Sequence, residues 1–147
     1  MNEYFSNYLC HGTWKNRSIT FLDCSRILDL IQADLGSSVV SPDILHYLYL
    51  LASHSKKYHS NEVPDDIVTM NSEVILQYEN NQEQTIRIVY PEDIKTPQDK
   101  SIYSPVGAAC LGATEKSFIY YNDEYGYNRA FIEKLVFQPE KEKLFYL

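Results

Sequence analysis

Two hydrophobic periods divide the chain near Pro64. Before it, apolar residues recur at the three- and four-residue spacing of amphipathic helices, and after it they alternate with polar residues, as in half-buried strands. The change falls within residues 55–66, a charged segment that contains the proline. We therefore expect an α+β protein with an N-terminal helical unit at residues 1–63 and a β-sheet domain at residues 64–147.

The first unit is predicted to be a short antiparallel hairpin of two helices. Asp23 is expected to cap the first helix, and Gly36 ends it. Ser41 is the expected N-cap of the second helix, and Pro42 takes its first position, where a missing N–H costs nothing. With about twelve residues per helix and 1.5 Å per residue, the hairpin should project about 18 Å. The apolar stripes are formed by Ile27, Leu28, Ile31 and Leu35, and by Leu45, Leu48, Leu51 and Ala52.

The second unit is predicted to be a small antiparallel sheet of four or five strands with one short helix. Alternating apolar residues indicate a β-hairpin around the turn at 79–83 and a second one around the turn at 122–127. Residues 92–100 are polar and are expected to form a connection. The strands are expected at 73–78, 84–90, 117–121 and 128–137.

The short helix lies within "YSPVGAACLG", residues 103–112. Ser104 is a good N-cap, Pro105 suits the first helical position, and Gly112 is placed as a left-handed terminator. Gly107 and the two alanines after it leave this helix thin enough to lie close against the sheet. Capping and packing alone would explain these residues.

Charge and composition exclude several classes of function. The net charge of -7 and the pI of about 5.0 disfavour binding to a phosphate backbone. No apolar run is long enough for a signal peptide or a membrane span, so we expect a cytoplasmic protein. Cys10, Cys24 and Cys110 are widely spaced, which disfavours a disulfide framework or a zinc site. His11 beside Cys10 is not expected to form a metal site, and no cofactor is expected.

Four motifs in order resemble a known pattern: "VTMNS" at 68–72, "VYPED" at 89–93, "SPVGAACLG" at 104–112 and "FQPE" at 137–140. They resemble the C-terminal domain of the GreA/GreB transcript cleavage factor superfamily. Within it, they are most similar to the regulator of nucleoside diphosphate kinase, which has a short N-terminal hairpin. The resemblance covers about residues 64–140.

The resemblance implies an FKBP-like domain that binds RNA polymerase beside its secondary channel. A hairpin of about 18 Å is too short to carry acidic residues to the polymerase active centre, as a cleavage factor does. We therefore expect a non-enzymatic regulator that competes with cleavage factors, with no catalytic residue and no direct sequence-specific contact with nucleic acid. The family name suggests nucleoside diphosphate kinase as an alternative partner. Fold analogy alone suggests a prolyl isomerase.

The same resemblance points to Tyr103, Ser104, Pro105 and Gly107 as the polymerase-binding segment. The residue before Ser-Pro is often acidic in the cleavage factors, so Tyr103 is a departure from the pattern. A tyrosine there can serve as an aromatic anchor at an interface.

Two acidic residues flank the hairpin turn. Asp34 and Asp43 could mimic the acidic tip of a cleavage factor. The alternative is that Asp43 interacts with the dipole of the second helix and that Asp34 is solvated.

Overall fold

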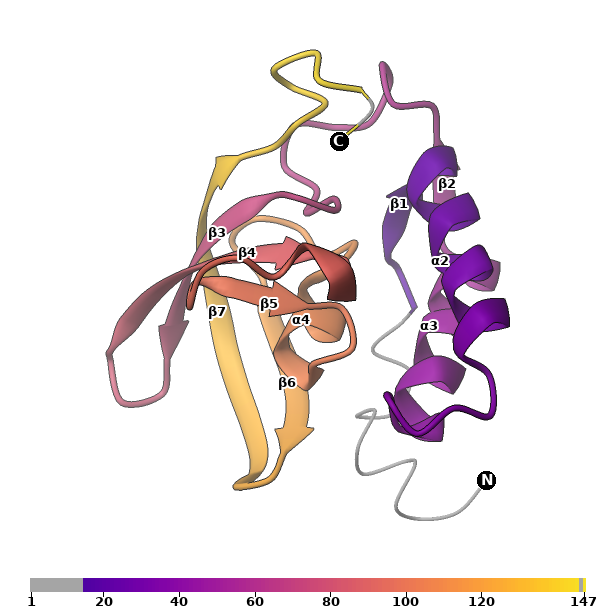
Figure 1. Cartoon of the computed structure of the whole chain (residues 1–147). Coiled ribbons are helices and arrows are strands. Elements are labelled where there is room, and N and C mark those ends of the chain that lie inside the picture. Colours follow the sequence, from indigo (N-terminus) through magenta and orange to yellow (C-terminus); the bar gives the residue numbers. More distant parts are fainter. Residues whose placement is uncertain (1–14, 146) are drawn as a thin grey trace.

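The computed structural model describes residues 15–145 and 147. A hairpin of two helices lies along one side of a twisted five-stranded sheet, and a short helix packs on the sheet face towards the hairpin (Figure 1). The α+β fold class predicted from the sequence is confirmed. Within the described residues, no helix is both long and apolar enough to cross a membrane. Cys10 and His11 lie outside the described residues.

The hairpin consists of α2 (Phe21–Asp34) and α3 (Pro42–His54). The predicted cap of α3 is confirmed, because Ser41 Oγ accepts a hydrogen bond from Ile44 N at 3.2 Å and Pro42 begins the helix. The predicted cap of α2 is wrong. The helix begins two residues before Asp23, and the capping side chain is Thr20, whose Oγ1 accepts from Asp23 N at 2.9 Å. The carboxylate of Asp23 is thereby directed into the protein.

A pair of very short parallel strands closes the base of the hairpin. They are β1 (Ser18–Thr20) and β2 (Lys56–Tyr58). Ser18 N also donates to the carbonyl oxygen of Gly112 at 3.2 Å. At Gly112 φ is +80°, as predicted for a helix terminator, and a Cβ there would lie 3.0 Å from Ser18 O. The base of the hairpin is therefore held against the end of the short helix.

The sheet is mixed, with the order β5-β4-β3-β7-β6. The four predicted strands are present and pair antiparallel. The fifth strand, β5, pairs parallel with β4 at one edge, so the prediction of a wholly antiparallel sheet is wrong at that edge. It follows a single 3-10 turn, η1 (Pro91–Asp93), within the segment predicted as a polar connection. The strands are β3 (Glu73–Tyr78), β4 (Glu83–Val89), β5 (Asp99–Ser101), β6 (Phe118–Asp123) and β7 (Gly126–Phe137).

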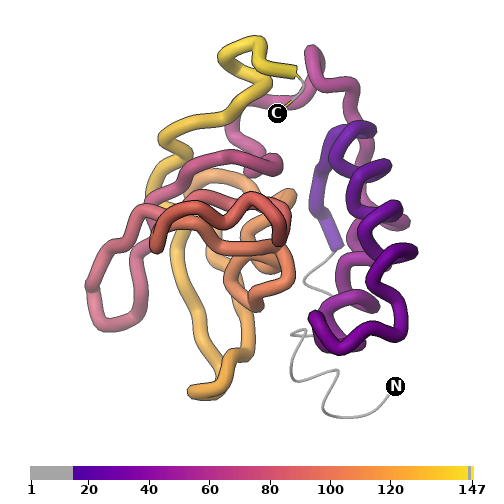
Figure 2. The backbone as a smooth tube through the Cα atoms, in the orientation of Figure 1, coloured from indigo at the N-terminus to yellow at the C-terminus, as the bar shows by residue number. Residues whose placement is uncertain are grey.

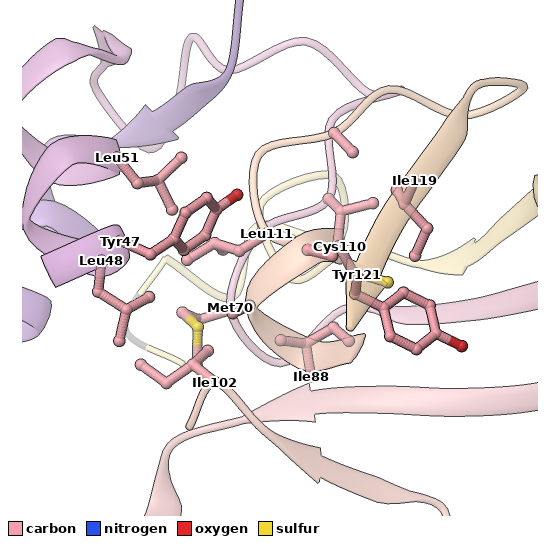
Figure 3. Close-up of a cluster of buried hydrophobic side chains, with 14 of the residues drawn as sticks. Tyr47, Leu48, Leu51, Met70, Ile88, Ile102, Cys110, Leu111, Ile119 and Tyr121 are labelled. Atoms are coloured by element: carbon pink, nitrogen blue, oxygen red, sulfur yellow. The ribbon is translucent and has the colours of Figure 1, made fainter. Parts of the chain in front are cut away.

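One hydrophobic core joins the hairpin to the sheet. The side chains of Tyr47, Leu48 and Leu51 on α3 face Met70 and Leu111 of the second unit (Figure 3). Leu48, Leu51, Met70 and Leu111 are fully buried. The hairpin is thus packed along the sheet domain through α3.

The end of the chain returns to the segment that follows β2 (Figure 2). Gln138 Nε2 donates to the carbonyl oxygens of Pro64 at 2.9 Å and Ile67 at 2.7 Å. Thr69 Oγ1 donates to Glu140 Oε1 at 2.6 Å, and Glu140 is buried. The "FQPE" motif therefore fastens the loop that leads into the sheet.

Asp23 supplies a polar connection inside this core. It is 1% exposed, and its two carboxylate oxygens accept from Met70 N at 3.1 Å and from Tyr90 Oη at 3.2 Å. Burial raises the pKa of Asp23 above its usual value of 3.8, although both hydrogen bonds oppose that shift. The hairpin is thereby hydrogen-bonded to the sheet domain at a buried position.

Two substitutions of Asp23 should separate the stabilisation by its hydrogen bonds from the destabilisation by its buried charge. Asp23→Ala leaves Met70 N and Tyr90 Oη without their hydrogen-bond acceptor in a buried place, so we expect a loss of about 2 to 4 kcal/mol in the free energy of unfolding. Asp23→Asn keeps an acceptor oxygen and should cost less. Urea denaturation at pH 7 measures both variants, and an equal loss would contradict the hydrogen-bonding role.

The raised pKa of Asp23 also fixes the sign of a pH effect. The folded state binds the Asp23 proton more tightly than the unfolded state does. The contribution of Asp23 to the free energy of unfolding is therefore fully present below the pKa of the unfolded state and is lost as pH rises through the pKa of the folded state. The stability of the wild type relative to Asp23→Asn should therefore fall as pH rises from about 4. Urea denaturation of both proteins over this range tests it, and a difference that rises with pH would contradict it.

Candidate functional site

The candidate site is the turn that leads from β5 into α4 (Pro105–Cys110). The carbonyl oxygen of Ser101 accepts from Ser104 N at 2.9 Å and from Ser104 Oγ at 2.6 Å. Ser104 Oγ in turn accepts from Gly107 N at 3.2 Å, which confirms the predicted N-cap. One backbone oxygen on the edge strand therefore holds the start of α4. Ser104 and Pro105 are half-buried, so part of each remains accessible.

Gly107 lies beneath this surface. It is buried, and a Cβ at this position would lie 2.1 Å from the Ser101 carbonyl oxygen. The expected close approach of the helix is confirmed, and its partner is the backbone at the end of β5. Ala108 and Ala109 are also buried. Of the four residues predicted for this segment, Gly107 shapes the backbone, whereas Tyr103, Ser104 and Pro105 reach the surface.

Gly107→Ala should therefore be destabilising. The added methyl group overlaps a backbone oxygen that also accepts two hydrogen bonds, so we expect a loss of about 1 to 3 kcal/mol. Ser53→Ala on the exposed side of α3 is a matched control, because it changes a small helical residue without entering the core. Thermal and urea denaturation compare the two variants. A Gly107→Ala protein as stable as the control would show that α4 can move away from β5.

Two of the predicted residues come together from opposite parts of the chain. The hydroxyl of Tyr103 donates a hydrogen bond to Asp34 Oδ2, at the last residue of α2. Burial raises the pKa of Tyr103, and the Asp34 carboxylate raises it further, so the phenol remains protonated. Asp34 is therefore not simply solvated. Asp43 lies in the first turn of α3, where a negative charge is favourable for the helix dipole.

The surroundings of Tyr103 are acidic and partly apolar. Glu92 of η1 is near enough to raise the pKa of Tyr103, as Asp34 does. Next to Asp34 the hairpin tip carries Leu35, which is 74% exposed, and Val39, which is 70% exposed. The hairpin tip, η1 and the start of α4 thus contribute to one region of the surface.

A second feature was missed by the sequence analysis. An open hollow of about 760 Å³ lies beside the start of α4, between the turns that join β3 to β4 and β6 to β7. Its lining includes Tyr78, Tyr121, Tyr125 and Pro105. Burial raises the pKa of both Tyr78 and Tyr121. The sequence contains 13 tyrosines, but their number does not show that Tyr78, Tyr121 and Tyr125 line one hollow.

The described residues contain no group of three or more histidine, cysteine, aspartate or glutamate side chains placed to hold a metal ion. Cys110 is fully buried, and burial raises its pKa to about 12, so its thiol is protonated and inert at neutral pH. Cys24 is half-buried and its Sγ lies 3.6 Å from the carbonyl oxygen of Ala52. Among the described residues, Cys24 and Cys110 are free thiols.

Part of the second unit matches a known family. Residues 63–126 match the family described as "Transcription elongation factor, GreA/GreB, C-term". The chain is similar to the solved structure of a prokaryotic transcription elongation factor GreA/GreB from Nitrosomonas europaea, with 27% identity and a TM-score of 0.68. That match covers 83% of this chain and 98% of the other. Residues 63–126, which include β3 to β6 and α4, are therefore similar to the C-terminal domain of the GreA/GreB transcription elongation factors.

Two further solved structures show weaker similarity. The transcription factor Gfh1 is 14% identical with a TM-score of 0.44, covering 84% of this chain and 99% of the other. GreA factor homolog 1 (Gfh1) from Thermus thermophilus is 16% identical with a TM-score of 0.43, and the match covers 82% of this chain and 99% of the other. These values add no argument about function. None of the curated proteins searched matches the sequence.

Proposed function

We propose that this protein is a non-enzymatic regulator that binds RNA polymerase near the secondary channel through its GreA/GreB C-terminal domain. The observation that carries the proposal is the family match, together with the partly exposed Ser104 and Pro105 at the start of α4. The family consists of transcription elongation factors, and the segment that the resemblance assigns to polymerase binding is accessible and held rigidly by the Ser101 carbonyl. The protein would act in the cytoplasm, where bacterial RNA polymerase is found.

The hairpin supports regulation without transcript cleavage. The longer of its helices, α2, has 14 residues, which at 1.5 Å per residue spans about 21 Å. The hairpin is packed along the sheet domain through Tyr47, Leu48 and Leu51 of its other helix, α3. At the tip, Asp34 is hydrogen-bonded to Tyr103. An arm of this length that lies against its own anchor domain is suited to occupying space near the channel and to excluding a longer factor.

The binding surface can be tested by a double substitution. We expect Ser104→Glu with Pro105→Asn to weaken binding to core RNA polymerase at least tenfold, because both side chains would lie in the interface. The matched control is Thr96→Glu with Pro97→Asn, the same kind of change at an exposed loop outside the predicted segment. Biolayer interferometry with polymerase from a related bacterium measures both. Equal binding by the two folded variants would reject the site assignment.

The mode of regulation can be tested on backtracked elongation complexes. We expect that the protein competes with a cleavage factor for polymerase and lowers the rate of transcript cleavage that this factor stimulates. We expect no stimulation when the protein is added alone with magnesium. Gel analysis of the RNA measures both effects, and stimulation by the protein itself would contradict a purely regulatory role.

The tyrosine-lined hollow favours one second candidate function. Aromatic hollows bind proline-containing peptides, and a prolyl isomerase needs such a site with a few polar groups aimed into it. Acceleration of the isomerisation of a proline-containing peptide would support this function, and no acceleration would remove it. Binding to nucleoside diphosphate kinase stays a prediction from the resemblance, to be tested by co-purification.

A further inference from the structure

The hydrogen bond between Tyr103 and Asp34 joins the two parts of the molecule at the candidate surface. We propose that Asp34 is a positioning residue, which holds the phenol of Tyr103 so that the hairpin tip and the loop before α4 present one composite binding surface. This inference rests on the proposed function, because it concerns the same surface. It goes beyond the proposed function because it assigns the hairpin a role in shaping the binding surface of the C-terminal domain.

The geometry fixes Tyr103 at both ends. Its backbone N donates to Ser101 Oγ at 2.9 Å, and its ring packs against the core. The hydroxyl is committed to Asp34 Oδ2. The phenol therefore cannot turn outward while the hydrogen bond is present, and a partner meets the ring rather than a free hydroxyl group.

The position of Asp34 supports a specific role. It is the last residue of α2, where the helix dipole is negative and a carboxylate is unfavourable. No basic residue lies in the last turn of that helix. A hydrogen bond from a partly buried phenol offsets this unfavourable placement, since bonds to a charged acceptor are among the stronger ones. The carboxylate of Asp34 is therefore stabilised by a residue of the sheet domain and not by its own helix.

The composite surface also defines the chemistry of its partner. The negative charges of Asp34 and Glu92 both act on Tyr103, and the exposed side chain of Leu35 follows directly after Asp34. The whole chain carries a net charge of -7. Such a surface fits a protein face that offers an apolar pocket for the aromatic ring and arginine or lysine side chains around it, because charges across an interface are complementary.

The first part of the test uses the free protein. Asp34→Ala and Tyr103→Phe each remove the hydrogen bond, and Phe keeps the ring. We expect each to increase hydrogen exchange about fivefold in peptides that cover residues 30–40, and the double variant to add no further increase. Asp34→Asn keeps an acceptor oxygen and should restore part of the protection. Asp29→Ala, at an exposed position of the same helix, is the matched control and should leave exchange unchanged.

The second part measures binding of the same variants to core RNA polymerase. Each single variant should weaken binding about three- to tenfold, and the double variant should bind no worse than the weaker single variant, because both changes break one interaction. Additive losses would overturn the proposal, since they would mean that Asp34 and Tyr103 act separately on the partner. Unchanged exchange in both single variants would also overturn it.

The two readouts distinguish this inference from the proposed function. If the wild-type protein does not bind polymerase, the proposed function fails. The exchange data then decide by themselves whether Asp34 positions Tyr103. If the wild type binds and the exchange of the variants is unchanged, the proposed function stands and the positioning role fails.

Discussion

The apolar side chains of α3 are buried partly against α2 and partly against the sheet domain, and the arrangement of the whole molecule depends on the second contact. Two helices of 13 and 14 residues are too short to be stable in isolation, because a single helix of fewer than about 15 residues is marginal in water. Leu48 and Leu51 are fully buried against residues of the second unit. The hairpin is therefore ordered by the domain on which it lies, and Asp23 adds the hydrogen bonds that fix its direction.

The Ser101 carbonyl oxygen has a comparable role on the other side of the core. It is the end of the edge strand β5, and it accepts both hydrogen bonds from Ser104 while α4 approaches it through Gly107. The parallel pairing of β5 with β4 brings this oxygen to the place where α4 begins. A three-residue strand thus positions the segment that carries the candidate binding surface.

The sequence predicted the features that are encoded locally. Ser41, Pro42, Ser104 and Pro105 occupy caps that neighbouring residues define, and the alternation around Val74 and Ile86 marks strands whose inner faces are buried. It did not predict β5 or the pair β1 and β2, because strands of three residues show too little alternation. Thr20 was passed over as a cap because Asp23 has the same preference, and only the fold shows that its carboxylate is needed elsewhere.

The candidate site likewise combines features that are encoded locally with features that depend on tertiary packing. The accessibility of the turn before α4 follows from its capping residues, so it could be anticipated. The meeting of Asp34 with Tyr103 joins residues 69 positions apart, and the hollow gathers tyrosines from separate strands and turns. Contacts of this kind depend on tertiary packing, which a single sequence does not reveal.

The contacts that hold the hairpin to the sheet domain leave the turn between α2 and α3 free to vary in length. The strands β1 and β2 and the buried Asp23 lie at the base of the hairpin, and Asp34 is hydrogen-bonded to Tyr103 just before the turn, whereas Gly36 within the turn has open space around it. Helical turns could be inserted between Gly36 and Ser41 without altering the base. Reach and anchoring are therefore separable properties of this architecture, and one docking domain can serve arms that extend to quite different depths.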